Sequence, residues 1–267
     1  MIWIEKFQGV TGIKMARMIL GKPFYFTSCY FVDSLLIDTG CVRAKNEVMP
    51  FFKDLNIDLI VNTHCHEDHI GLNSEFSCKI LASKLAIPFI NEPRKLEMKF
   101  YRRFAWGVPK PSYPEEIGKR VETENFKFEV ISTPGHSEGH ICLYENEKKW
   151  IFTGDLYIGG KDRVLRKDFD IWKIIDSLKK INSLNIEVMF SGSGKIYKNP
   201  NLKIHEKISY LENLGKKIFE MYDEGKTESQ ISRKLFGREG WFYYLSEGEF
   251  SSENLVKSFL KKKLYKL

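Results

Sequence analysis

One stretch, "VNTHCHEDHIG" at residues 61–71, constrains this chain more than any other. It brings His64, His66 and His69 together with Asp68, although the whole chain has only six histidines. The apolar run "IDLIVNT" that leads into it is typical of a short strand buried in a sheet. Imidazole and carboxylate groups are ligands that zinc, iron and manganese accept. The stretch therefore predicts a metal-binding loop at the end of a buried strand.

Two further candidate ligands follow later strands. The segment "FKFEVISTPGHSEGH" reads as a strand that ends in a turn before His136, and the hairpin "HICLYENEKKWIFTGD" ends at Asp155. One loop cannot surround a metal ion by itself, so we expect these two residues to join the histidine loop. Functional sites of layered α/β proteins gather where strands end and loops begin.

Strands and helices alternate along residues 1–200, which predicts a layered α/β architecture. Two strands joined near Asp33 and Ser34 are expected within residues 25–40. Further strands are expected at 57–63, 78–83 and 126–135, in a hairpin at 140–155 with its turn near 145–147, and in a last strand at 186–194. Apolar residues at helical spacing predict helices at 47–56 and 169–184.

The pattern becomes helical after Pro200, with three helices expected in residues 201–225, 227–237 and 251–264. Thr227 and Gln230 have the spacing of a capping box at the start of the second helix. We interpret residues 1–200 as the main domain and residues 201–267 as a helical extension packed on it. A winged-helix-like unit that binds nucleic acid is the alternative for this tail. The apolar stripes expected to face inward are Ile204, Ile208, Leu211, Ile218 and Tyr222 in the first helix, and Leu255, Val256, Phe259 and Leu260 in the third.

Composition indicates a globular protein, with 43% hydrophobic and 29% charged residues. The net charge of +7 fits an anionic substrate or nucleic acid, or simply a lysine-rich solvated surface. Five cysteines without pair spacing do not suggest a disulfide framework. No apolar run reaches the length of a signal peptide core or a membrane span, so a cytoplasmic protein without membrane association is expected.

Four motifs in order, "DTG", "THCHEDH", "TPGHSEGH" and "FTGD", resemble those of the metallo-β-lactamase superfamily. The segment "FTGDLYIGGKDR" is similar to the glyoxalase II-like branch. The resemblance runs from Asp38 to about Gly194 and leaves the helical tail outside. It implies a four-layer αββα sandwich with a helical C-terminal extension, and a metal site at the edge where the two halves meet.

The resemblance also implies roles for the residues of these motifs. The ligands of a first metal ion would be His64, His66 and His136. Asp68 and His69 would bind a second ion, and Asp155 would bridge the two. Asp38 would organise the histidine loop from behind, although a turn residue before Gly40 explains it equally well.

Ser193 marks a departure from the family pattern. It stands in "FSGSG", where the family places a histidine in a "GHG"-like segment after the last core strand. A hydroxyl is a poor ligand for a divalent ion compared with imidazole. No other histidine is close in sequence, because His140 belongs to the third motif and His205 to the following helix. The second metal position is therefore expected to bind more weakly than the first.

Three residues near the motifs have less specific interpretations. Cys65 is expected to point away from the flanking histidines as an inert filler. His140 is expected to support a ligand from behind or to pack in the core. Glu67 is expected to face solvent or to form a local hydrogen bond.

The resemblance implies a hydrolase in which a metal-bound hydroxide attacks an ester, thioester, lactone, β-lactam or phosphodiester. Zinc is the expected metal, with one or two ions per chain, and iron or manganese is the alternative. Asp68 would orient the water or accept its proton. The segment 91–114 interleaves basic and aromatic residues, which suits a wall around a small anionic substrate. It also fits an amphipathic helix with buried aromatics and solvated cations.

Two other functions stay open at this stage. A mononuclear iron oxygenase, resembling the persulfide dioxygenases of the superfamily, would use His64, His136 and Asp155 as a two-histidine, one-carboxylate triad. A protein that binds or processes nucleic acid would instead use the basic tail. The sequence does not decide the substrate, the occupancy of the second metal position or the oligomeric state.

Overall fold

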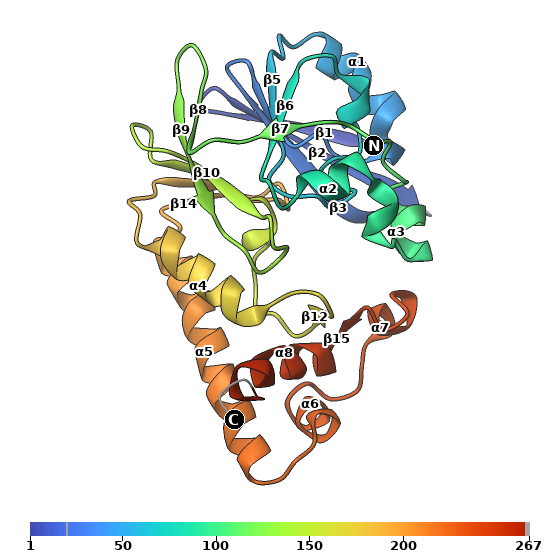
Figure 1. Ribbon diagram of the computed structural model, residues 1–267, viewed down its shortest axis with the longest axis vertical. Helices are drawn as coiled ribbons and strands as arrows, with labels where there is room; N and C mark the ends of the chain where they lie inside the picture. Colours follow the sequence, from blue (N-terminus) through green and yellow to red (C-terminus); the bar gives the residue numbers. More distant parts are fainter. Residues whose placement is uncertain (20, 265–267) are drawn as a thin grey trace.

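The computed structural model describes residues 1–19 and 21–264, and it has two β-sheets packed face to face with helices on both outer sides (Figure 1). The expected four-layer α/β sandwich with a helical C-terminal region is confirmed. The first sheet has the order β1-β2-β3-β4-β5-β6-β7, with β1 (Ile2–Phe7), β2 (Val10–Ile19), β3 (Lys22–Val32), β4 (Leu35–Ile37), β5 (Leu59–Val61), β6 (Lys79–Ala82) and β7 (Glu115–Glu116). The second has the order β14-β13-β11-β10-β9-β8, with β8 (Arg120–Glu122), β9 (Lys127–Ser132), β10 (Ile141–Glu145), β11 (Trp150–Phe152), β13 (Val188–Phe190) and β14 (Ile196–Lys198).

The core between the sheets is formed by apolar and aromatic side chains from both. Phe152 and Phe190 stack with their ring centroids 4.6 Å apart, and Tyr30 of the first sheet meets the Phe190 ring edge-on at 5.4 Å. Strands β4 and β5 read as continuous apolar runs because one face meets this core and the other faces helices.

Helices cover the outer face of each sheet. Val48 and Phe52 of α1 (Lys45–Lys53) pack under the first sheet together with Tyr101 of α3 (Phe100–Ala105). The short helix α2 (Ile87–Asn91) lies beside β6. The outer face of the second sheet packs against α4 (Ile171–Asn182), whose N-terminus is capped by the Asp170 carboxylate.

The C-terminal region contains α5 (Asn201–Asp223), α6 (Glu228–Phe236), α7 (Trp241–Leu245) and α8 (Ser252–Leu264). The capping box of α6 is present, since Thr227 Oγ1 accepts from the Gln230 backbone and the Gln230 side chain accepts from the Thr227 backbone. The inward residues expected for α5 and α8 are buried in the same cluster as α4, except that Tyr222 is only partly buried. The ribbon between β12 (Leu165–Arg166) and β15 (Phe250–Ser251) also joins this region to the main body. Because one apolar core spans both regions, the boundary at residue 200 stays a prediction.

Several elements differ from the sequence-based expectation. The hairpin of β1 and β2 was not predicted, and β14 pairs antiparallel with β13, so residues 186–194 are not the last strand. Strands β1 and β14 are the outer strands of their sheets, and β2 lies between β1 and β3. Polar residues interrupt the apolar pattern of all three strands. None of the described helices has the length and apolar content needed to cross a lipid bilayer.

Candidate metal centre

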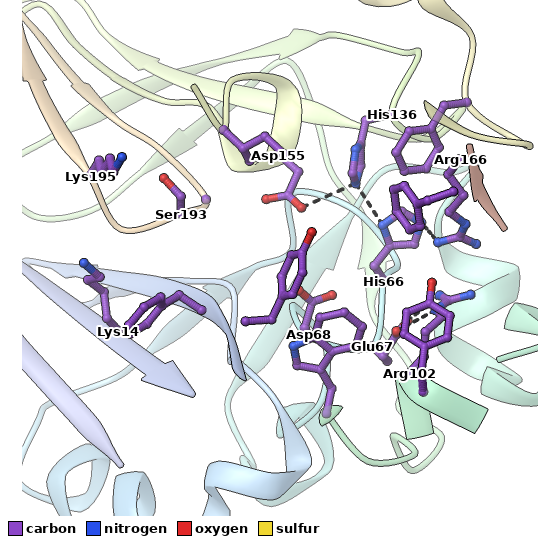
Figure 2. Close-up of a pocket in the computed structure, with 18 residues that line it drawn as sticks. Lys14, His66, Glu67, Asp68, Arg102, His136, Asp155, Arg166, Ser193 and Lys195 are labelled. Carbon is purple, nitrogen blue, oxygen red and sulfur yellow. Dashed lines mark hydrogen bonds and ion pairs between the residues drawn. The ribbon is translucent and has the colours of Figure 1, made fainter. Parts of the chain in front are cut away.

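Loops at the ends of five strands build the site. The strands β4 and β5 are parallel neighbours in the first sheet, and β11 and β13 are parallel neighbours in the second. Their carboxyl ends therefore lie along one edge, where the two sheets meet, and the loop after β9 joins them. Figure 2 shows His66, Asp68, His136, Asp155 and Ser193 around one cavity at this edge.

A first group consists of His64, His66 and His136, each of which offers a ring nitrogen within 4.8 Å of the others. His66 Nδ1 lies only 2.9 Å from His136 Nε2. Burial lowers the pKa of all three imidazoles, to about 3 for His136. Neutral imidazole with a free lone pair is the form that binds metal ions.

His64 supplies the test of whether a metal fits here. Its Nδ1 lies 3.0 Å from the Thr63 hydroxyl, whereas its Nε2 is buried without a hydrogen-bond partner among the described residues. A buried polar atom without a partner is uncommon and needs an explanation. Zinc–nitrogen bonds of about 2.0–2.1 Å in tetrahedral geometry separate neighbouring nitrogens by roughly 3.3 Å. The crowded nitrogens of this group therefore fit a cation of that size.

A second group consists of His64, His69 and Asp155, again with ligand atoms within 4.8 Å of one another. His69 Nε2 lies 3.4 Å from Asp155 Oδ1 and 3.7 Å from Asp68 Oδ2. The other oxygen of Asp155 lies 3.5 Å from His136 Nε2. Asp155 therefore lies between the two groups, and Asp68 lies beside the second.

The carboxylates of the site require positive charge nearby. Burial alone would lower the pKa of His69, but three surrounding carboxylates, led by Asp155, outweigh burial and hold it well above its ordinary value. Burial opposes ionisation of Asp155, but His69 outweighs burial and holds the pKa of this carboxyl well below its ordinary value. Burial raises the pKa of Asp68 to about 7. A protonated His69 or a metal cation would supply the charge that these carboxylates need.

Asp38 anchors the histidine loop from behind. Its buried carboxylate accepts hydrogen bonds from the Thr63 backbone and hydroxyl, both at 2.7 Å, and lies 2.7 Å from His69 Nδ1. Its backbone has a φ of 61°, which is uncommon for a residue other than glycine. The contacts fix the His69 ring so that Nε2 points toward Asp155, as outer hydrogen bonds of metal ligands commonly do.

Ser193 lies at the cavity wall, and its hydroxyl is 2.8 Å from the Ser191 hydroxyl. Next to it, the Gly192 backbone donates a hydrogen bond to the Gly154 carbonyl. A Cβ atom added to Gly192 would lie 2.1 Å from Asp155 Oδ1. Gly192 is thus required for the position of the Asp155 carboxylate, a role that sequence reasoning missed although "FSGSG" contains the glycine.

The structure shows the surroundings of the three residues near the motifs, Cys65, His140 and Glu67. Cys65 packs in an apolar cluster with residues of β6 and α2, and burial raises the pKa of its thiol to about 12. His140 lies behind His64 with ring centroids 5.2 Å apart, and its Nδ1 contacts the Thr133 hydroxyl at 2.8 Å. The solvent-facing interpretation of Glu67 is wrong, because this side chain is 1% exposed.

Glu67 instead belongs to a buried ion-pair network. The guanidinium of Arg102 on α3, itself 2% exposed, donates through both Nε and Nη2 to the Glu67 carboxylate. Arg102 Nη1 also lies 3.4 Å from Glu249 Oε1, and the Tyr101 hydroxyl donates to Glu249. Glu249, from the C-terminal region, therefore helps to compensate the charge of Arg102, which binds Glu67 in the histidine loop.

Arg166 extends this network to a candidate ligand. Its Nη1 lies 3.2 Å from His66 Nε2, and its Nε lies 2.8 Å from Asp168 Oδ1 and 3.4 Å from Glu249 Oε1. Arg102 lies in the basic and aromatic segment that the sequence singled out, but no sequence signal pointed to Arg166 or Glu249. Arg166 is the last residue of β12 and Glu249 directly precedes β15, and the two side chains meet only in the folded chain.

The cavity has a volume of about 530 Å³, a size typical of sites for small molecules. Only part of segment 91–114 reaches it, through Tyr101, Arg102 and Trp106, whereas Phe100 is 73% exposed on the opposite side of α3. The segment thus combines a cavity wall with an ordinary solvated helix face. The C-terminal region contributes Phe250 to the wall.

Comparison of the sequence and the structure with those of known proteins identifies relatives of this chain. The family model of the metallo-beta-lactamase superfamily matches residues 23–193. The chain is 27% identical over 236 residues to a beta-lactamase-like protein 2 homolog of Caenorhabditis elegans, covering 85% of this chain and 74% of the relative. It is 32% identical over 144 residues to the hydroxyacylglutathione hydrolase GloC of Haemophilus influenzae, covering 51% and 68%. A solved structure of a metallo-beta-lactamase family protein from Thermus thermophilus superposes with a TM-score of 0.71 at 18% identity, covering 96% of this chain and 94% of that one.

Proposed function

Because the chain belongs to the metallo-beta-lactamase superfamily and is a metallo-hydrolase of that superfamily, we propose that it hydrolyses a small-molecule thioester or ester. The observation that carries the proposal is the convergence of His64, His66 and His136, of which the last two line the cavity, while the buried His64 Nε2 has no hydrogen-bond partner among the described residues. The relative from Haemophilus influenzae, named a hydroxyacylglutathione hydrolase, favours a thioester within the wider range of superfamily substrates. An acyl group bound to the glutathione sulfur is a thioester.

We propose the following ligands for the metal centre. His64, His66 and His136 would hold the first ion, and Asp155 would bridge to the second. Asp68 and His69 would complete the second position, where Ser193 offers no imidazole. Zinc is the proposed metal because the donors are nitrogen and carboxylate oxygen, which iron and manganese also accept.

The protein's own groups have separate tasks in this reaction. When bound, a divalent ion would supply a Lewis acid and lower the pKa of a water molecule. Asp68 faces the cavity beside His69 and would orient that water or accept its proton. Asp38 keeps the His69 ring in place. Aromatic side chains from α3 and the C-terminal region would shield the acyl group from bulk water.

Elemental analysis of protein purified without added metal tests the proposal first. Chelator-stripped protein, protein reloaded with zinc, and untreated protein are then compared on neutral thioester, ester, lactone and phosphodiester substrates. We expect thioester or ester cleavage that is lost on stripping and restored by zinc. Cleavage that survives complete stripping would contradict the metal-dependent mechanism.

The iron oxygenase is the second candidate, because His64, His136 and Asp155 also form the donor set of a two-histidine, one-carboxylate site. Bound iron together with oxygen consumption on a persulfide, and no hydrolysis of the panel, would favour it. The hydrolase predicts the reverse. Nucleic-acid binding by the tail is tested separately, since binding of duplex DNA would fall steeply as salt is added.

A further inference from the structure

The cations that line the cavity fall into two kinds. Arg102 and Arg166 both have carboxylate partners, on the histidine loop and in the C-terminal region. Lys14 and Lys195 also line the cavity, but neither forms an ion pair with any residue that the structure describes. Figure 2 shows both lysines at the end of the cavity near Ser193, away from His66 and Arg166.

Lys14 is held in place by its surroundings. It lies in the middle of β2, where its backbone pairs with both β1 and β3. Its aliphatic stem packs on Gly194, at which an added Cβ would lie 2.2 Å from Lys14 Cγ. Its ammonium group lies 5.1 Å from the centre of the Phe26 ring. The packing of the stem on Gly194 and the Phe26 ring therefore set the position of the ammonium group, which forms no ion pair with Glu5 or any other described residue.

Lys195 comes from the other sheet. It follows Ser193 and Gly194 in the loop between β13 and β14, and its side chain is exposed at the mouth of the cavity. The two lysines thus approach one end of the cavity from opposite sheets, with Ser193 lying between Lys195 and Asp155 in Figure 2.

We propose that Lys14 and Lys195 form an anion-binding subsite that receives a carboxylate or phosphate group of the substrate, beside the metal centre on the Ser193 side. The inference rests on the proposed hydrolase function and narrows its substrate to an acyl compound with a negatively charged end. Two ammonium groups without acidic partners keep their charge available for such a group. A neutral hydroxyl at position 193 leaves this end free of a bulky imidazole.

Matched thioesters test the subsite on the metal-loaded protein. S-glutaryl-N-acetylcysteamine carries a terminal carboxylate that S-valeryl-N-acetylcysteamine lacks. S-valeryl-phosphopantetheine carries a phosphate on the thiol half that S-valeryl-pantetheine lacks. The variants are Lys14→Met, Lys195→Met and the double variant, because methionine retains most of the stem and removes the charge. Lys198→Met is the control, since Lys198 is exposed on β14 and does not line the cavity.

We expect each pocket variant to lower kcat/KM for one charged thioester by about tenfold, mainly through KM, with neutral thioesters changed by less than about twofold. A loss confined to the glutaryl compound assigns the carboxylate, and one confined to the phosphopantetheine compound assigns the phosphate. Lys198→Met should behave as the wild type. Equal losses on charged and neutral thioesters, or no loss on either charged compound, would overturn the subsite.

A binding measurement separates this inference from the proposed function. If the wild type cleaves none of the thioesters or esters, the hydrolase proposal fails, and calorimetric titrations with glutarate and with inorganic phosphate decide the subsite alone. Affinity for one of these anions that falls about tenfold in the double variant, but not in Lys198→Met, supports the subsite. Unchanged affinity for both anions in the double variant contradicts it.

Discussion

Neighbouring residues of the histidine loop have opposite tasks. His64 Nε2 is buried without a hydrogen-bond partner among the described residues and belongs to the histidine group, whereas Cys65 packs behind the loop among apolar side chains. We expect His64→Ala to lose bound metal and to lower activity by more than about a hundredfold, since changes behind a ligand alone cost ten- to a hundredfold. Elemental analysis and thioester assays of purified protein measure both effects.

Cys65→Ser is the matched control for that experiment. The thiol contacts no candidate ligand atom in the described contacts, so metal content and activity should stay close to those of the wild type. Loss of metal from the serine variant would show that Cys65 has a role in the site that its position does not suggest.

We expect Ser193 to weaken the proposed second metal position, because it offers no imidazole there. Its hydroxyl contacts Ser191, whereas the residues proposed for the second position, Asp68, His69 and Asp155, lie close to one another. We expect wild-type protein to keep nearer one ion than two after dialysis against a weak chelator, and Ser193→His to raise the content toward two. Metal analysis after dialysis, with and without excess zinc, gives the result.

Tight retention of two ions by the wild type would contradict this expectation and require another ligand. His205, the nearest other histidine in sequence, is exposed on α5 and lines a separate hollow, so it does not supply that ligand. A backbone carbonyl near Ser193 would be the next candidate.

At the scale of elements, the loop after β13 determines where the loop after β11 places Asp155. The two loops are joined by the hydrogen bond from Gly192 to Gly154, and no side chain fits between them. Gly192→Ala should displace the Asp155 carboxylate and weaken metal binding by at least about tenfold. Competition with a metal-binding dye measures the affinity.

Gly240→Ala is the control substitution at this scale. Gly240 has a φ of −77° and open space around its Cα, so alanine fits without displacement. If both alanine variants bind metal as tightly as the wild type, the close approach at Gly192 does not position Asp155.

At the scale of the whole molecule, the C-terminal region is part of the site. Glu249 compensates both Arg102 and Arg166, and through Arg102 it supports Glu67 in the histidine loop. Glu249→Gln removes one negative charge from beside two buried guanidinium groups, which then have only Glu67 and Asp168 as carboxylate partners. We expect the free energy of unfolding to fall by about 3 kcal/mol and metal affinity to fall with it. Urea denaturation of metal-loaded protein measures the first effect.

Glu253→Gln gives the comparison within the same region. Glu253 pairs with Lys257 one turn along α8 at the surface, where an ion pair contributes little to stability. Equal urea midpoints for the two glutamine variants would mean that the buried network does not stabilise the fold.

The sequence by itself determined the local features of this protein. Continuous apolar runs located β4, β5 and the β10–β11 hairpin, because strands buried on both faces tolerate few polar residues. The capping box of α6 could be predicted from the sequence because its two residues, Thr227 and Gln230, lie within one helical turn. The histidine loop was readable because its candidate ligands are packed into one short stretch after a strand.

Only the tertiary structure decided how distant segments meet. The pairing of Arg102 with Glu67 and Glu249, the contact of Arg166 with His66, and the approach of Lys14 to the Ser193 loop join residues from separate elements. Single charged residues in a sequence look like solvated surface, and their burial depends on which sheet edges and helices are packed together. The outer strands β1 and β14, and β2 between β1 and β3, were not predicted for the same reason, since their partners, and not their own pattern, hold them in the sheet.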